Sequence, residues 1–230
     1  MSENRKFSVL MSVYVKENPV FLEEAVESII HQTLKPSEVV IVEDGPLTPE
    51  LYQVLEKLEA QSSIPIKRCP LEQNRGLGLA LQYGVLQCQY DVIARMDTDD
   101  IAVEDRFEQQ FELMEKENLD LLGGHIAEFI DQPDEIVSYR RVPIKHEDIV
   151  VYQRMRSAFN HMTVMFKRKM VLKAGNYEDG LYMEDDLLWL NMISAGARTG
   201  NVDQILCKVR VGAGMFERRG GLRYLKLYRQ

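Results

Sequence analysis

The stretch Asp91-Val92-Ile93-Ala94-Arg95-Met96-Asp97-Thr98-Asp99-Asp100 decides the fold expected of this chain. Its first six residues form a short, mostly apolar run with the length and composition of a buried strand. Three acidic residues follow within four positions, where that strand should end. Ligands of open α/β sheets lie beyond the carboxyl ends of the strands, so this stretch predicts a sheet of that class and its functional edge.

Runs of strand length precede this stretch and alternate with helical patterns. The strand-like runs are Phe7–Tyr14, Glu38–Glu43 and Ile64–Arg68. Asn18 is placed to cap a helix that begins at Pro19, and a second helix is expected from Pro49. Strands that alternate with helices of this length predict βαβ units. We therefore expect an α/β fold with a mainly parallel sheet that is flanked by helices on both faces.

The regular rhythm ends after Gly123-Gly124. Leu119–Leu122 and Thr163–Phe166 have the composition of strands, and a helix is expected from Glu184 to about Ala195. The chain shows no internal repeat, low-complexity segment or flexible linker. We expect one domain over residues 1–230, with a first lobe at about 6–123, a smaller C-terminal lobe at about 124–212 and a basic tail at 213–230.

Composition and charge exclude several classes of protein. The net charge of −8 argues against general binding of nucleic acid. No apolar run is long enough for a membrane span, and the N-terminus lacks an apolar segment with a cleavage site. The three cysteines are odd in number and lack metal-type spacing, which favours a reducing compartment. We expect a cytoplasmic protein.

Basic residues are concentrated near the C-terminus. From Lys208 to Gln230, seven basic residues stand against one acidic residue, so the rest of the chain carries a net charge of −14. A basic tail on an acidic body predicts contact with an anionic surface or ligand. The alternative is a solvated terminal helix.

Two acidic clusters follow predicted strands. Glu43-Asp44-Gly45 closes the second strand, where an acid can bind a base N–H or ribose hydroxyls; an ordinary Asp-Gly turn is the alternative. Asp97 and Asp99 flank Thr98, and side chains alternate in an extended segment, so both carboxylates are expected on one side. Hard oxygen ligands in this position suit Mg²⁺ or Mn²⁺. The alternative is a solvated helix start that Asp100 caps.

Two further segments carry candidate chemistry. Glu184-Asp185-Asp186 opens a predicted helix, where acids gain from the helix dipole or can supply a general base. Asn74-Arg75-Gly76 offers a guanidinium and free backbone N–H groups at another helix start, as a phosphate or ribose contact. Gly76 and Gly78 do not complete a dinucleotide fingerprint, because Leu81 stands at the third glycine position. A nicotinamide enzyme is therefore not expected.

Taken in order, five motifs resemble the inverting family 2 glycosyltransferases with the GT-A (Rossmann-like) fold. The resemblance spans roughly residues 6 to 212. The matching segments are Ser8–Tyr14, Val40–Gly45, Asn74–Gly78, Ala94–Asp100 and Met183–Trp189. Residues 210–215 and 218–221 also look like those of bacterial capsule and exopolysaccharide transferases. The resemblance implies that the first lobe binds a nucleotide-sugar donor and that the smaller lobe binds the acceptor.

The resemblance also implies roles for individual residues. Asp185 would be the catalytic base, and Glu184 would lie in the acceptor pocket. His161 would help form the acceptor side or would be a structural hydrogen-bonding group. Asp97 and Asp99 would bind Mn²⁺ or Mg²⁺. The nucleotide would be bound by Ser12, Tyr14, Glu17, Glu43, Asp44, Asn74, Arg75, Gly76 and Asp97.

The function that this resemblance implies is transfer of a sugar, typically from a UDP-sugar, to a hydroxyl of a saccharide or lipid-linked saccharide. Processive members carry a Gln-X-X-Arg-Trp motif and membrane spans, which this sequence lacks, so a single addition is expected. The basic tail is expected to contact the inner face of the plasma membrane. The alternatives are a sugar-phosphate nucleotidyltransferase, which needs a Gly-rich basic loop that residues 15–19 do not provide, and a non-catalytic nucleotide-sugar binder.

Overall fold

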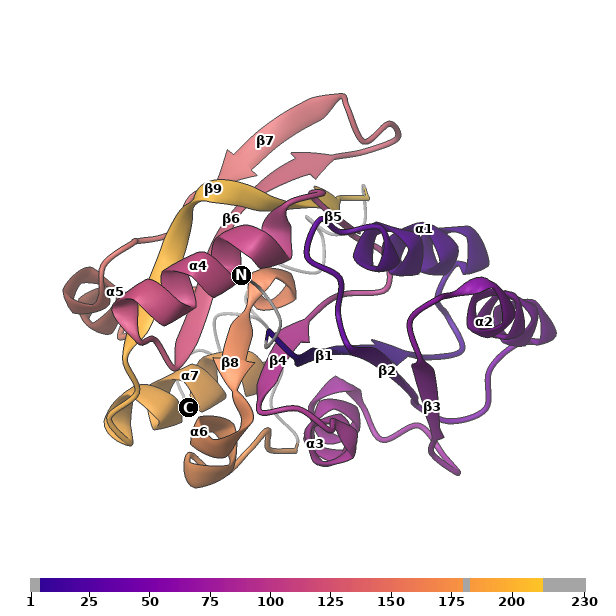
Figure 1. The fold of residues 1–230 in the computed structure, drawn as a ribbon, viewed down its shortest axis with the longest axis horizontal. Coiled ribbons are helices and arrows are strands. Elements are labelled where there is room, and N and C mark those ends of the chain that lie inside the picture. Colours follow the sequence, from indigo (N-terminus) through magenta and orange to yellow (C-terminus); the bar gives the residue numbers. More distant parts are fainter. Residues whose placement is uncertain (1–4, 180–182, 213–230) are drawn as a thin grey trace, which may run out of the picture.

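The structure is a computed structural model that describes residues 5–179 and 183–212. Its centre is one sheet of nine strands, in the order β3-β2-β1-β4-β8-β6-β9-β5, with β7 paired to β6 (Figure 1). The strands are β1 (Phe7–Val13), β2 (Glu38–Glu43), β3 (Ile66–Pro70), β4 (Val92–Arg95), β5 (Ile101–Ala102), β6 (Leu121–Phe129), β7 (Ile136–Arg140), β8 (Met165–Lys167) and β9 (Thr199–Arg210). The helices are α1 (Pro19–Ile30), α2 (Pro49–Gln61), α3 (Leu77–Gln87), α4 (Arg106–Glu117), α5 (His146–Tyr152), α6 (Arg168–Lys173) and α7 (Glu184–Ser194), with a 3₁₀ helix, η1 (His161–Thr163).

The first half of the sheet is parallel, as the alternating pattern predicts. β1 pairs with β2 and β4, and β2 pairs with β3, all in parallel. The helices between these strands begin where their caps predict. The Asn18 side chain accepts a hydrogen bond from the N–H of Val20, and Thr48 accepts one from the N–H of Leu51. A proline occupies the first turn of α1 and of α2, where its missing N–H costs nothing.

Helices cover both faces of this sheet, and each face has its own apolar core. On one side α1, α2 and α4 pack against Val9 and Ile41, and on the other side α3, α6 and α7 pack against Leu10 and Val40 (Figure 1). Successive residues of a strand point to opposite faces, so the nearly continuous apolar runs of β1 and β2 supply both cores. The structure thereby confirms the predicted α/β class.

The second half of the sheet is mixed and differs in detail from the prediction. β4 pairs antiparallel with β8, β8 with β6, and β6 with β7, whereas β6 and β9 are parallel. The strand expected at Leu119–Leu122 begins only at Leu121 and extends to Phe129 as β6. The expected strand Thr163–Phe166 is instead the end of η1 followed by β8. The predicted boundary between residues 123 and 124 lies inside β6, and the division into lobes stays a prediction.

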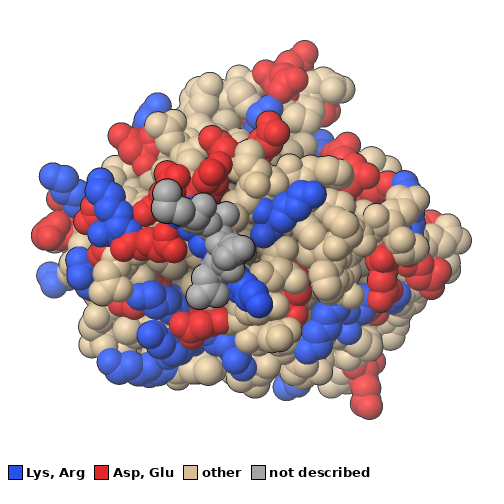
Figure 2. Space-filling model, in the orientation of Figure 1, with Lys and Arg blue, Asp and Glu red and all other residues tan. Residues whose placement is uncertain are grey.

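Charged side chains are distributed over both halves of the sheet. On the face seen in Figure 2, acidic and basic side chains are interspersed, and acidic ones gather at the tip of the β6–β7 hairpin, where Asp131, Asp134 and Glu135 are exposed. None of the helices in the described ranges is long and apolar enough to cross a membrane. The basic tail predicted at residues 213–230, including its suggested membrane contact, lies outside the described residues.

Candidate active site

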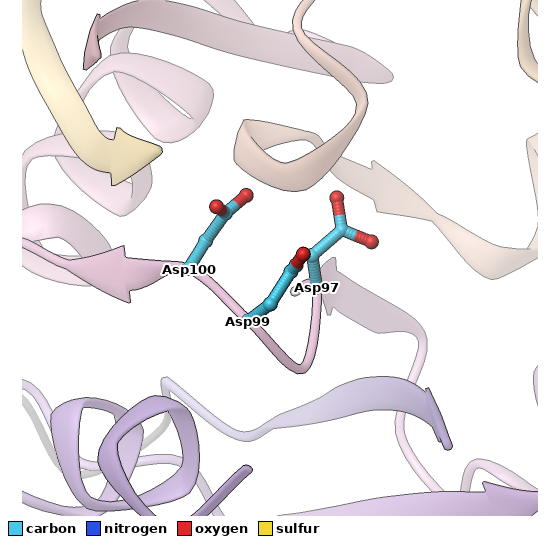
Figure 3. Close-up of side chains that lie close together, drawn as sticks. All are labelled: Asp97, Asp99 and Asp100. Atoms are coloured by element: carbon cyan, nitrogen blue, oxygen red, sulfur yellow. The ribbon is translucent and has the colours of Figure 1, made fainter. Parts of the chain in front are cut away.

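The loop between β4 and β5 brings three carboxylates together. Ligand oxygens of Asp97, Asp99 and Asp100 all lie within 4.8 Å of one another, and the three side chains project to the same side of the loop (Figure 3). We call residues 97–100 the acidic loop. The loop bends at Thr98 and Asp99, so the carboxylates converge through this bend and not through the alternation of an extended strand. Asp100 joins the group instead of capping a helix, since α4 begins only at Arg106.

The surroundings of the acidic loop disfavour ionisation of all its carboxyl groups at once. Burial, reinforced by Asp97, raises the pKa of Asp99 to about 6. Burial raises the pKa of Asp100 well above its usual value, and both neighbouring carboxylates raise it further. One Asp100 oxygen accepts a hydrogen bond from the N–H of Arg210 at the end of β9. Crowded carboxylates of this kind suit a divalent cation with hard oxygen ligands.

Arg95 is the counter-charge of this loop. Its side chain is 2% exposed and forms an ion pair with Asp97, while its carbonyl accepts a hydrogen bond from Arg106. Two guanidinium nitrogens of Arg95, Nε and Nη1, are buried without a hydrogen-bond partner. A buried charge is costly unless it is paired. Arg95 was not among the predicted site residues, although a lone arginine inside an apolar strand is the signal that could have identified it.

The turn between β1 and α1 adds a fourth carboxylate, Glu17, near the acidic loop. Burial, together with Asp99 and Asp97, raises the pKa of Glu17 to about 7. Ser12 and Tyr14, both half-buried, lie at the same end of β1, and the Ser12 carbonyl accepts a hydrogen bond from the Thr98 hydroxyl at 3.5 Å. Ser12 and Glu17, both predicted to contact the nucleotide, therefore lie beside the acidic loop.

The end of β2 has a different arrangement from the one expected. The Asp44 carboxylate accepts hydrogen bonds from the N–H groups of Arg75 at 2.7 Å and Gly76 at 3.0 Å, so these N–H groups are not free. The Asn74 amide donates to the Asp44 carbonyl. Asp44 thus holds the turn before α3 against the end of β2 and leaves the exposed Arg75 side chain facing outward from a fixed backbone.

Glu43 and Gly45, which flank Asp44, have structural partners. Glu43 is 3% exposed and accepts a hydrogen bond from Arg68 Nε at 2.6 Å. Gly45 has φ +84°, and a Cβ there would lie 2.5 Å from the backbone nitrogen of Asn74. Only glycine fits this close approach. The family-based role of Glu43 as a nucleotide contact would therefore compete with its ion pair to Arg68.

Asp185 and Asp186, at the start of α7, face different neighbours. Asp186 accepts a hydrogen bond from Gln153 Nε2 at 2.8 Å. Asp185 Oδ2 lies 4.0 Å from His161 Nδ1. Burial, reinforced by Asp186 and Glu184, raises the pKa of Asp185 to about 7. Burial also raises the pKa of Glu184. A carboxylate with a pKa near neutrality is suited to general-base catalysis.

His161 lies between Asp185 and a buried tyrosine. Its Nε2 is 2.9 Å from the Tyr177 hydroxyl, and its ring packs edge-on against Trp189. Burial lowers the pKa of His161 well below its usual value, helped by the charge of Arg95, so the imidazole is neutral. Tyr177 was not predicted, because nothing in the sequence connects it to a histidine sixteen positions earlier.

Contacts between helix starts join these groups into one site. A Cβ on Gly78, in the first turn of α3, would lie 3.3 Å from Cβ of Glu184 in the first turn of α7. Arg95 and Asp97 both act on the pKa of Glu184. The carboxyl ends of β1, β2 and β4 and the start of α7 therefore meet at one place, as expected of ligand sites in open α/β sheets.

The sequence matches the model of glycosyl transferase family 2 over residues 8–175. The amylovoran biosynthesis glycosyltransferase AmsE of Erwinia amylovora is 42% identical over 96% of this chain and 82% of its own length. The UDP-Gal:alpha-D-GlcNAc-diphosphoundecaprenol beta-1,3-galactosyltransferase of Escherichia coli is 38% identical over 95% of this chain and 79% of its own.

Solved structures share the fold at low sequence identity. S. aureus TarS 1–349 in complex with UDP-GlcNAc has a TM-score of 0.74 at 18% identity and covers 97% of this chain and 64% of its own. The mannosyltransferase PcManGT of Pyrobaculum calidifontis, in complex with GDP-Man and Mn²⁺, has a TM-score of 0.68 at 16% identity, over 89% of this chain and 56% of its own.

The fold, the meeting of acidic clusters at the strand ends and the family match agree with the resemblance read from the five motifs. They favour a glycosyltransferase over a nucleotidyltransferase or a non-catalytic binder. This chain belongs to glycosyl transferase family 2 and has the GT-A fold of its structural neighbours.

Proposed function

We propose that this protein transfers one sugar, with inversion, from a UDP-sugar to a hydroxyl of a lipid-linked saccharide in the synthesis of a cell-surface polysaccharide. The observation that carries the proposal is the position of Asp185. A carboxylate with a pKa of about 7 lies in one site with a loop of three converging acids, and the charge of the buried Arg95 acts on both. Asp185 can take the proton of the acceptor, while the acidic loop faces the departing diphosphate.

The residues of the acidic loop fit a divalent cation. Three carboxylates lie within 4.8 Å of one another beside the guanidinium of Arg95, and Arg210 also acts on Asp99, so ionisation of all three carboxylates would still leave a surplus of negative charge. Asp97 and Asp99 would hold Mn²⁺ or Mg²⁺, and the Mn²⁺ in the mannosyltransferase neighbour supports this choice. When bound, the cation supplies positive charge that offsets the charge developing on the diphosphate.

The chain's own groups perform the proton transfer. The acceptor hydroxyl gives its proton to Asp185 while its oxygen forms a bond to the anomeric carbon. The bond from that carbon to the diphosphate oxygen breaks, and the nucleoside diphosphate leaves with the bonding electrons. Attack opposite the leaving group inverts the anomeric centre. Glu184, next to Asp185 at the start of α7, would contact the acceptor sugar.

The substrates are proposed from the relatives. The name of the E. coli relative states UDP-Gal as donor and a sugar-diphosphoundecaprenol as acceptor, and TarS binds UDP-GlcNAc. AmsE supports a role in exopolysaccharide synthesis. A lipid-linked acceptor lies at a membrane, so we extend the proposal to a peripheral contact of the basic tail with the inner membrane face, which rests on the sequence alone.

The test replaces Asp185 by asparagine. Asp185→Asn keeps the shape of the side chain but cannot take a proton, so transfer of labelled galactose from UDP-Gal to a synthetic GlcNAc-diphospholipid should fall by about 10²–10⁴-fold. UDP binding, measured by calorimetry with Mn²⁺, should stay within about threefold of wild type. Transfer by Asp185→Asn within a few-fold of wild type would exclude this residue as the base.

The matched control is Asp186→Asn, the same change one position later. Asp186 is turned toward Gln153 rather than toward His161, so its loss should lower transfer by less than about tenfold. Equal losses in the two variants would mean that the start of α7 acts through its total charge, and that no single base can be assigned there.

A further inference from the structure

Tyr177 and His161 form a buried pair whose outer nitrogen faces Asp185. Tyr177 is 0% exposed, and its hydroxyl lies 2.9 Å from His161 Nε2. The second ring nitrogen, Nδ1, lies 4.0 Å from Asp185 Oδ2. Three elements meet in this line: the segment after α6, the 3₁₀ helix η1 and the start of α7. The family match gives no role to this arrangement, so its protons have to be worked out from the hydrogen bonds.

Burial determines where the protons are. Burial raises the pKa of the Tyr177 phenol far above neutrality, so its O–H keeps its proton and has to donate it. Among the described residues, the single acceptor within hydrogen-bond distance of that hydroxyl is His161 Nε2. Since the imidazole is neutral and its Nε2 accepts, its one proton resides on Nδ1.

The opposite tautomer has two defects. With the proton on Nε2, the Tyr177 O–H would be left without an acceptor, which costs about 1–3 kcal/mol for a buried donor. The lone pair of Nδ1 would then face the Asp185 carboxylate. The tautomer with Nδ1–H instead directs a donor toward that carboxylate.

We propose that His161 is a positioning residue for Asp185, held by Tyr177 in the tautomer that points its N–H at the base. This inference rests on the proposed function, since it takes Asp185 as the base. The distance of 4.0 Å is longer than a hydrogen bond, and such contacts often shorten in the enzyme–substrate complex. A carboxylate held through Oδ2 presents its other oxygen to the acceptor hydroxyl in a fixed direction.

Replacing His161 separates this role from packing. In His161→Asn the amide N–H takes nearly the place of Nδ1–H, whereas in His161→Gln the amide lies nearer the place of Nε2. We expect His161→Asn to keep kcat within about tenfold of wild type and His161→Gln and His161→Leu to lose about 10–100-fold, mostly in kcat. KM for the acceptor should change little. Equal losses in all three variants would overturn the proposal.

The pH dependence of kcat/KM distinguishes the proposed role of His161 from a packing role, because a loss of packing alone would not change the pKa of Asp185. The charged and titratable groups around Asp185 are Asp186 and Glu184 from α7, Arg95 from β4, and the His161–Tyr177 pair. Asp186, Glu184 and Arg95 are unchanged in His161→Leu, which removes the Nδ1–H that favours the ionised carboxylate. The acid limb of kcat/KM should therefore move up by about one pH unit in His161→Leu and stay in place in His161→Asn. An unmoved limb in both variants would contradict the proposal.

Nuclear magnetic resonance tests the tautomer without any assay of transfer. In the full chain labelled with ¹⁵N-histidine, Nδ1 of His161 should have the shift of a protonated ring nitrogen and Nε2 that of an unprotonated one. Tyr177→Phe should shift both toward a mixture of tautomers. Protonated Nε2 in the wild type would overturn the inference even if Asp185→Asn abolishes transfer, whereas full transfer by Asp185→Asn would refute the proposed base and leave the tautomer result intact.

Discussion

The acidic loop and the start of α7 each bring three acidic side chains to the same edge of the sheet, but they arrange them in opposite ways. In the loop the carboxylates converge within 4.8 Å and share one buried cation, Arg95. At the start of α7 they diverge, because Asp186 faces Gln153 and Asp185 faces His161.

This difference separates two kinds of chemistry. Convergent carboxylates repel one another and are stabilised by a cation that they share. Divergent carboxylates can each take a distinct environment, and burial brings one of them, Asp185, to a pKa of about 7. Both clusters contain three acidic residues in the sequence. Their carboxylates point in different directions because the backbone differs: it bends in the acidic loop and forms a helical turn at the start of α7.

Among the variants that test this distinction between the clusters, Asp99→Asn is expected to have the largest effect. This change removes one ligand charge from the convergent set, so UDP binding in the presence of Mn²⁺ should weaken by more than about 100-fold, because a direct ligand costs at least as much as its supporting groups. Calorimetry with UDP and Mn²⁺ measures the loss. Asp185→Asn is the matched control, since it makes the same chemical change in the divergent set and should leave binding in place. Equal weakening in both variants would refute the distinction between the clusters.

A smaller effect is expected from Arg95→Met, which removes the shared cation but keeps a side chain of similar length. Asp97 would lose its ion pair but is 28% exposed, so we expect the free energy of unfolding in EDTA to fall by about 1.5–3 kcal/mol, less than for a fully buried pair. The loss is limited because two guanidinium nitrogens of Arg95 are already buried without partners. With its counter-charge removed, the loop should attract a cation more strongly, so Mn²⁺ should raise Tm more than it does in wild type.

Arg95→Lys is the control for this prediction. It keeps the positive charge, so the increase of Tm with Mn²⁺ should match that of wild type, as measured by differential scanning calorimetry. An increase in Arg95→Met no larger than in wild type would mean that Arg95 does not act as the electrostatic partner of the acidic loop.

The parallel half of the fold could be predicted from the sequence, because its physical signals are local. Buried parallel strands appear as continuous apolar runs, and Asn18-Pro19 and Thr48-Pro49 mark the helix starts directly. β9 could not be predicted in the same way. Its twelve residues, Thr199–Arg210, alternate irregularly between buried and exposed, because the strand pairs with β6 through register shifts and then with β5.

The candidate site was predictable only in part for the same reason. Acids that follow a buried strand are visible in the sequence, so Asp97 and Asp99 could be selected as a group. The hydrogen bonds from the N–H groups of Arg75 and Gly76 to Asp44 could not be predicted, because they depend on how the turn before α3 folds back onto the end of β2. The pairing of side chains from separate segments is a property of the fold, not of any local motif.

The smallest expected effect is a change of Tm with pH, which arises because several carboxyl groups of the site have a higher pKa in the folded protein than in the unfolded chain. The pKa values of Glu17 and Asp185 are raised to about 7 and that of Asp99 to about 6. A carboxyl with a raised folded pKa binds protons more tightly in the folded state, so its stabilising contribution is complete below its unfolded pKa and is lost as the pH rises through the folded pKa. Asp120 and Asp134, whose pKa values are lowered, change protonation at more acidic pH, outside this window.

In EDTA, Tm should therefore fall by about 2–4 °C between pH 5.5 and pH 8, for each kcal/mol that these groups contribute. Glu17→Gln removes one of the three groups and should flatten the slope, while Glu50→Gln, at the exposed start of α2, should not. Mn²⁺ should reverse the slope, because the ligands must be ionised to bind it and its affinity rises with pH. Scanning calorimetry over this range measures the slope. A Tm that rises with pH in EDTA would contradict the prediction, because it would show that the crowded carboxylates are already ionised in the folded protein without a cation.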